Sequence, residues 1–213
     1  MSDTVVAKDI AAAAAILRAG GVGVFPTDTV YGVGAHAFIE AAVRRIYAVK
    51  GRPADKPLQL LLARVQDIES VAELTPEARL LAARFLPGGL TLVLRRQPVV
   101  PDIVTAGGDT VAVRVPDLLL LQRLIDAVGA PLAATSANRS GEPAPADADE
   151  ARAALGDLVD FVLDGGCCPA AQESTIVDLS GPEPRLLRPG AVPAEAIEAV
   201  LGRALARAES TAD

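Results

Sequence analysis

Residues 9–25, DIAAAAAILRAGGVGVF, contain the change of pattern that decides the fold. The first part predicts a helix over residues 9–19, because its apolar side chains recur on one helical face, at Ile10, Ala13, Ala14 and Leu17. Gly20-Gly21 ends that helix. The apolar run Val22–Phe25 then predicts a buried strand, which Pro26 ends. A helix followed at once by a buried strand is typical of an α/β protein.

Helical and strand-like segments alternate along the rest of the chain. Helices are expected over residues 40–49, 76–86, 117–128 and 193–201, the third with Asp117 as its N-terminal cap. Strands are expected over residues 58–62, 90–95, 110–115, 131–134, 161–163, 175–179 and 185–187. The Pro- and Ala-rich residues 142–148 predict an exposed loop. We therefore predict one α/β domain over residues 1–201, followed by a polar tail over residues 202–213.

The composition argues against several function classes. The chain has 27 acidic and 20 basic residues, a formal net charge of -7 and 3% aromatics, which disfavours a dedicated nucleic-acid-binding module. With one histidine, His36, and with Cys167 next to Cys168, neither a Ser-His-Asp triad nor a protein-held metal site is expected. No apolar run reaches the roughly 18 residues of a membrane helix, and no secretory signal is seen, so a cytoplasmic protein is expected.

Three polar clusters follow predicted strands or helices, where α/β folds usually place their sites. They are PTDTVYG at 26–32, KGRPADKP at 50–57 and TSAN at 135–138. The cations of the second cluster could clamp a carboxylate or a phosphate, or could merely cap the preceding helix. The hydroxyl and amide groups of the other two could bind a small polar ligand or could merely stabilise turns. Spacing alone leaves both interpretations open.

Arg114 stands out because it lies on an otherwise apolar strand. Thr110 and Arg114 alternate with Val111, Val113 and Val115, so both are predicted to point to the face opposite the valines. A buried arginine needs a partner. That partner is either an internal carboxylate or the carboxylate of a ligand.

Taken together and in this order, the clusters resemble the YrdC-like family of L-threonylcarbamoyladenylate synthases. The matching blocks are PTDTVYG at 26–32, KGRPADKPL at 50–58, PGGLTLVL at 87–94, DTVAVRVP at 109–116, TSAN at 135–138, ESTIVD at 173–178 and LLRPG at 186–190. The resemblance implies a twisted, mostly open mixed sheet with flanking helices. It also implies a nucleotidyltransferase that converts L-threonine, bicarbonate or CO2, and ATP into threonylcarbamoyl-AMP and pyrophosphate, for the threonylcarbamoyl modification of adenosine 37 in tRNA.

The resemblance further implies roles for single residues. The family's catalytic signature falls on Lys50, Arg52, Ser136 and Asn138. Its ATP contacts fall on Arg52, Lys56, Thr110, Ser136, Ala144 and Arg188, with the loop at 142–148 closing over the nucleotide. Its threonine contacts fall on Thr29, Arg114, Ala134 and Ser174. Mg2+ is expected to arrive with ATP, and no protein metal ligand is assigned.

The implied partners are ATP, L-threonine and bicarbonate or CO2, with downstream tRNA threonylcarbamoyl-transfer proteins. A weak tRNA contact is left open, and no membrane is expected. One alternative is an RNA-binding or ribosome-associated module of the same fold without catalysis. Another is a related carbamoyl-transfer domain, which normally belongs to a longer chain. Threonine-dependent pyrophosphate release separates the leading hypothesis from these alternatives.

Overall fold

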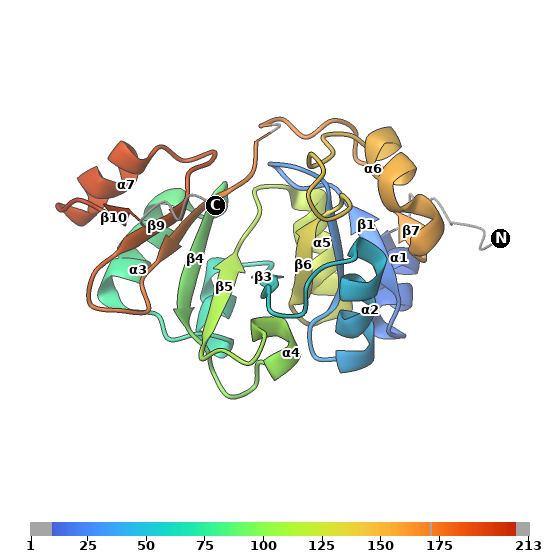
Figure 1. Ribbon diagram of the computed structural model, residues 1–213, viewed down its shortest axis with the longest axis horizontal. Helices are drawn as coiled ribbons and strands as arrows, with labels where there is room; N and C mark the ends of the chain where they lie inside the picture. The colour runs from blue at the N-terminus through green and yellow to red at the C-terminus, as the bar shows by residue number, and fades with distance from the viewer. Residues whose placement is uncertain (1–9, 171, 208–213) are drawn as a thin grey trace.

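The computed structural model describes residues 10–170 and 172–207, which form one ten-stranded sheet. Its strand order is β10-β9-β8-β4-β5-β3-β6-β2-β1-β7, with β9 and β10 at one end and β1 and β7 at the other (Figure 1). The strands are β1 (Val22–Phe25), β2 (Gly32–His36), β3 (Gln59–Leu61), β4 (Leu90–Arg95), β5 (Thr110–Arg114), β6 (Leu132–Ser136), β7 (Phe161–Val162), β8 (Thr175–Asp178), β9 (Arg185–Arg188) and β10 (Ala206–Arg207).

The sheet is mixed and open, which confirms the expected fold class. Four neighbouring pairs are parallel, namely β1 with β7, β3 with β5, β4 with β8, and β9 with β10. The other pairs are antiparallel. Because β7 and β10 pair with only one neighbour, the sheet does not close into a barrel.

Helices cover the two faces of the sheet unequally. They are α1 (Ile10–Arg18), α2 (Glu40–Lys50), α3 (Pro76–Phe85), α4 (Asp102–Thr105), α5 (Leu119–Val128), α6 (Ala148–Leu155) and α7 (Ala194–Leu201). Apolar residues of α2, α3, α6 and α7 pack in the larger core with one set of strand side chains, including Leu60, Leu92 and Val113. Apolar residues of α1 and α5 pack with the alternate set, including Phe25, Leu61 and Leu132, near β1 and β6. The second face is therefore covered by helices at one end.

Most of the expected elements are present with small shifts at their ends. The strands over Val22–Phe25 and Leu90–Arg95 have the predicted bounds. The first helix is confirmed from Ile10, while Asp9 lies outside the described residues. The predicted cap at Asp117 is wrong: α5 begins after Leu118, without a side-chain hydrogen bond at its cap. The buried face of α5, including Leu121 and Leu124, is what holds this helix.

The pattern did not reveal β2, which occupies part of the stretch that was interpreted as a polar turn. Gly32 and Gly34 lower its strand propensity. The structure explains Gly34, because a Cβ at this position would lie 2.7 Å from the Ala133 carbonyl oxygen and 2.8 Å from the Phe25 ring. A central strand between β1 and β6 therefore needs glycine at this position.

The segment expected as an exposed loop at 142–148 is exposed only in part. Glu142 and Pro143 are exposed, but Pro145 is buried and its carbonyl accepts a hydrogen bond from the Tyr31 N–H at 2.8 Å. Ala148 begins α6, a helix that was not predicted. Asp147 caps it by accepting a hydrogen bond from the Glu150 N–H at 2.8 Å.

The segment expected as a polar tail also contains structure. Leu205 is buried, and its N–H donates to the Glu198 side chain at 2.9 Å. This contact brings Ala206–Arg207 beside β9 as the short parallel strand β10. The folded part therefore extends past residue 201 at least to Arg207. Within the described ranges, no helix has the length and apolar character needed to cross a membrane.

Candidate active site

A cavity of about 320 Å³ lies on the face that carries α1 and α5, over the strands from β6 to β9. Part of its floor is one row of paired residues, Ala134, Gln59, Ala112 and Val93, on four neighbouring strands. Paired residues on neighbouring strands share a face. Small side chains in this row leave space above the sheet, and loops at the strand ends supply the polar walls.

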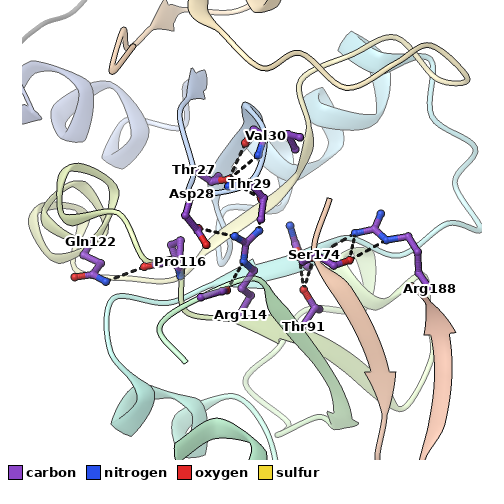
Figure 2. Close-up of polar contacts among 12 residues, drawn as sticks. Thr27, Asp28, Thr29, Val30, Thr91, Arg114, Pro116, Gln122, Ser174 and Arg188 are labelled. Atoms are coloured by element: carbon purple, nitrogen blue, oxygen red, sulfur yellow. Dashed lines mark hydrogen bonds and ion pairs between the residues drawn. The ribbon is translucent and has the colours of Figure 1, made fainter. Parts of the chain in front are cut away.

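Arg114 lies at one end of the cavity and is 2% exposed. Its guanidinium donates to the Gly88 carbonyl at 2.9 Å, to Thr29 Oγ1 at 2.7 Å and to Asp28 Oδ1 at 2.5 Å (Figure 2). Burial lowers the pKa of Arg114, and the Asp28 carboxylate opposes that shift. The partner of this arginine is thus an internal carboxylate, one of the two alternatives. Three of its five N–H groups are used, which leaves one on each terminal nitrogen for a ligand.

Arg188 lies on the opposite wall, at the end of β9. It donates to the Ser174 carbonyl oxygen at 2.9 Å and to Ser174 Oγ at 3.2 Å, and it pairs with Glu173 at 2.9 Å. Ser174 Oγ in turn lies 2.8 Å from the buried hydroxyl of Thr91 on β4 (Figure 2). These contacts join the loop before β8 to the floor of the cavity.

Lys50 is the last residue of α2 and is 4% exposed. Its ammonium group donates to the Ser136 carbonyl oxygen and to Asn138 Oδ1, the latter at 3.1 Å. Asn138 Nδ2 donates to the Glu142 carbonyl oxygen at 2.5 Å, which ties the next loop into the same cluster. Burial, and then the nearby Arg52, lower the pKa of Lys50 to about 8, while Glu173 opposes the shift.

The loop after α2 carries the other two expected cations. Arg52 donates to the carbonyl oxygens of Lys56 at 3.1 Å and Pro57 at 2.8 Å, so the guanidinium holds its own loop in a tight turn. Arg52 and Lys56 both line the cavity. With Arg114 and Arg188, four cations face a cavity to which Glu173 contributes a carboxylate, so the lining favours an anionic ligand.

The structure brings most of the predicted site residues together. The predicted residues that line the cavity are Thr29, Arg52, Lys56, Arg114, Ala134, Ser136, Ser174 and Arg188. Lys50 and Asn138 lie behind that lining, where Lys50 joins the Ser136 carbonyl oxygen to the Asn138 side chain. Thr110 is at the far end of β5 from Arg114, and Ala144 is in the loop before α6; neither lines the cavity.

Four polar residues of the site were not assigned a role from the sequence. Asp28 was grouped with the first cluster, but only the fold shows that it balances the charge of Arg114. Glu173 precedes the predicted strand at 175–179 and pairs with Arg188. Gln59 is the one polar residue of β3, and Thr91 is the one polar residue of β4 before its last residue, Arg95. That isolation is the one signal that could have identified them.

The arrangement suits a reaction that joins anions rather than one that needs a histidine base. Arg114 and the Thr29 hydroxyl can hold a small carboxylate at one end, and Arg52, Lys56 and Arg188 can neutralise phosphate oxygens. Among the described residues, no group of three or more His, Cys, Asp or Glu is placed to hold a metal ion. The side chains present are compatible with Mg2+ that arrives on substrate phosphates, the mode in which Mg2+ usually binds.

A model of the Sua5/YciO/YrdC family, described as "Telomere recombination", matches residues 15–190. The chain is 47% identical over 191 residues to the threonylcarbamoyl-AMP synthase of Pyrococcus abyssi, which covers 89% of this chain and 56% of that protein. It is 44% identical over 197 residues to the putative threonylcarbamoyl-AMP synthase of Mycobacterium tuberculosis, which covers 92% of this chain and 90% of that protein. The chain thus spans little more than half of the P. abyssi relative.

The fold of this chain is similar to that of a solved relative. The crystal structure of P. abyssi Sua5 complexed with L-threonine matches it with a TM-score of 0.90 and 45% identity, covering 93% of this chain and 58% of that one. The resemblance inferred from the seven sequence blocks is confirmed by these matches. This chain belongs to the Sua5/YciO/YrdC family.

Proposed function

We propose that this protein is a threonylcarbamoyl-AMP synthase, a nucleotidyltransferase that uses L-threonine, bicarbonate or CO2, and ATP. One observation carries the proposal: a single cavity joins the Arg114–Thr29 pair to Arg52, Lys56 and Arg188. The curated relatives named above, and the L-threonine complex of P. abyssi Sua5, support it. They do not favour the alternative of a binding module without catalysis.

Threonine would bind at the Arg114 end of the cavity. The two free N–H groups of Arg114 would bind its carboxylate, and hydroxyl groups from Thr29 and Ser174 would add hydrogen bonds. Both hydroxyls belong to buried residues. An amino acid without a hydroxyl group would lose the hydrogen bonds to Thr29 and Ser174 and would be used more slowly.

ATP would bind across the basic side of the cavity. Arg52, Lys56 and Arg188 would neutralise the phosphates, and Ser136, held from behind by Lys50, would bind an oxygen beside them. Thr110 and Ala144 remain predicted nucleotide contacts that would require the adenosine to extend past the lining described above. Mg2+ would enter on the phosphates and supply further charge neutralisation there.

The reaction needs no covalent intermediate with the protein. The threonine amine and bicarbonate give a carbamate and water, or the amine and CO2 give the carbamate and a proton. A carbamate oxygen then attacks the α-phosphorus of ATP, and pyrophosphate leaves. Holding the two anions in a near-attack geometry could lower the barrier by about 7–11 kcal/mol. The lining cations reduce the repulsion between them.

The same proposal covers the wider context of the reaction. The product would be passed to proteins that transfer the threonylcarbamoyl group to adenosine 37 of tRNA. Because ATP and tRNA are cytoplasmic molecules, the reaction would take place in the cytoplasm. A weak contact with tRNA remains a prediction.

Pyrophosphate release by the purified protein tests the proposal. The assay contains ATP, Mg2+ and bicarbonate with L-threonine, L-serine, L-valine or no amino acid. We expect release that depends on threonine and is much slower with valine, which lacks the hydroxyl group. Release at the same rate without an amino acid would contradict the proposed function.

A further inference from the structure

Gln59 occupies a central place in the cavity and has no role in the site described so far. It is the first residue of β3 and the one polar side chain in the floor row Ala134, Gln59, Ala112 and Val93. Gln59 lines the main cavity, and it also lines a recess of about 20 Å³ beside Thr29 and Arg114. The side chain therefore lies where the threonine end of the cavity meets the side that carries Arg52 and Arg188.

A series of hydrogen bonds with a fixed direction ends on Gln59. Arg188 can only donate, so Ser174 Oγ accepts its N–H at 3.2 Å. The Thr91 hydroxyl donates to the Gln59 Oε1 atom at 3.3 Å, since an amide oxygen only accepts. Thr91 has one hydroxyl hydrogen, so in its 2.8 Å contact with Ser174 the serine must be the donor.

This direction decides what Gln59 offers to a ligand. Its oxygen is taken by Thr91, and no hydrogen bond within residues 10–170 and 172–207 uses its Nε2 atom. The Nε2 atom is not fully buried, and Gln59 lines the cavity, so a ligand in the cavity can reach this atom. The Nε2 group is thus available to donate to a ligand, and hydrogen bonds that begin at a guanidinium polarise the amide toward stronger donation.

We propose that the Gln59 Nε2 group donates a hydrogen bond to the oxygen of the threonine carbamate that does not attack phosphorus. This inference rests on the proposed function. The carbamate carbon must lie between the threonine nitrogen and the α-phosphate, and Gln59 lines both the recess beside Arg114 and the cavity that carries the phosphate-binding cations. A neutral donor holds the carbamate in position and withdraws less charge from the attacking oxygen than a cation would.

The test compares Gln59→Met, which keeps the length of the side chain, with Gln59→Glu, which places a carboxylate in the same shape. Gln66→Met is the matched control, because Gln66 is exposed and lies outside the cavity lining. Pyrophosphate release is measured against bicarbonate at saturating threonine and ATP. Threonine binding is measured separately by calorimetry without bicarbonate. Thermal melting checks that each variant is folded.

We expect Gln59→Met to lower kcat/KM for bicarbonate at least about tenfold, as for a lost hydrogen bond to a charged group. Gln59→Glu should lower it further through like-charge repulsion, while Gln66→Met matches the wild type. Threonine affinity should change less than about twofold. If Gln59→Met does not fold, Gln59→Glu carries the test.

Two results would overturn the inference while the wild type still shows threonine-dependent turnover. One is an unchanged kcat/KM for bicarbonate in both variants. The other is an equal loss of threonine affinity, which would indicate a general role in shaping the floor. A wild-type protein without threonine-dependent release would overturn the proposed function itself, and the two failures are thereby distinguishable.

Discussion

The Lys50 ammonium group lies 3.1 Å from Asn138 Oδ1, across 88 positions of sequence, in a buried contact. The same group donates to the Ser136 carbonyl oxygen. The two acceptors lie at the end of β6 and just after it, where Ser136 lines the cavity. Lys50 and Asn138 therefore lie behind the cavity lining in this structure, and their catalytic role stays a prediction.

The buried position of Lys50 predicts a pH dependence of stability. Its pKa is lowered to about 8 from an ordinary value of 10.5, so above pH 8 the folded protein has released a proton that the unfolded chain still binds. Stability should then rise with pH from about 8 to 10.5, by up to about 1.4 kcal/mol per pH unit. Urea unfolding of the wild type and Lys50→Met across this range measures it. If the unfolding free energies of the two proteins change with pH in parallel, the lowered pKa of Lys50 is contradicted.

The ion pair between Asp28 and Arg114 predicts a coupled effect on stability. Asp28→Asn keeps the shape but leaves a guanidinium that is 2% exposed without its counter-charge, which should cost about 3–5 kcal/mol. Asp28→Asn with Arg114→Met should cost less than the sum of the single changes, because no charge is then left unpaired. Denaturant titration of the wild type, the two single variants and the double variant gives the coupling energy of the pair. If the cost of the double variant equals the sum of the two single costs, the pair does not interact.

The tight packing around Gly190 leads us to expect that a side chain at this position disturbs the site. A Cβ at this position would lie 2.3 Å from the Glu173 carbonyl oxygen and 2.6 Å from the Thr175 nitrogen. These are backbone atoms that cannot move aside, so Gly190→Ala should destabilise the fold by about 1–3 kcal/mol and reduce turnover by displacing Ser174. Gly181→Ala is the matched control, since a Cβ there meets nothing within 4 Å. Equal melting temperatures for the two variants would refute the expected destabilisation by Gly190→Ala.

Replacing Arg188 should affect ATP binding strongly and the stability of the fold only slightly. Its pair with Glu173 is partly exposed, with side-chain exposures of 36% and 42%, so Arg188→Met should change the unfolding free energy by no more than about 1 kcal/mol. The KM for ATP should rise about tenfold or more, because a phosphate loses a charged donor. Arg185→Met, at an exposed position on the same strand, is the control. An unchanged KM for ATP in Arg188→Met would remove Arg188 from the proposed nucleotide site.

The sequence predicted the parts of the fold that depend on local pattern. The strand at Leu90–Arg95 and the alternation of Arg114 with Val111 and Val113 follow from spacing alone, and both are present. β2 could not be predicted in this way. Its Gly34 is required by the close approach of the Ala133 carbonyl, a contact that exists only after the strands have paired.

The same limit applies to the site. The family blocks identified the lining cations and the small residue Ala134. They did not separate Lys50, which is buried behind the lining, from Arg52, which faces the cavity, because both occur in one basic loop. Gln59 and Thr91 look like isolated exceptions in apolar strands. Their relation to Ser174 appears only when β3, β4 and the loop before β8 are brought together.

Incorporation of 14C-labelled bicarbonate into an AMP adduct tests most directly the claim that one cavity joins threonine, a carboxyl group and ATP. The account predicts label in a nucleotide product only when threonine and ATP are both present, with about one pyrophosphate released for each label incorporated. Pyrophosphate released without incorporation of label, or label incorporated without threonine, would contradict it.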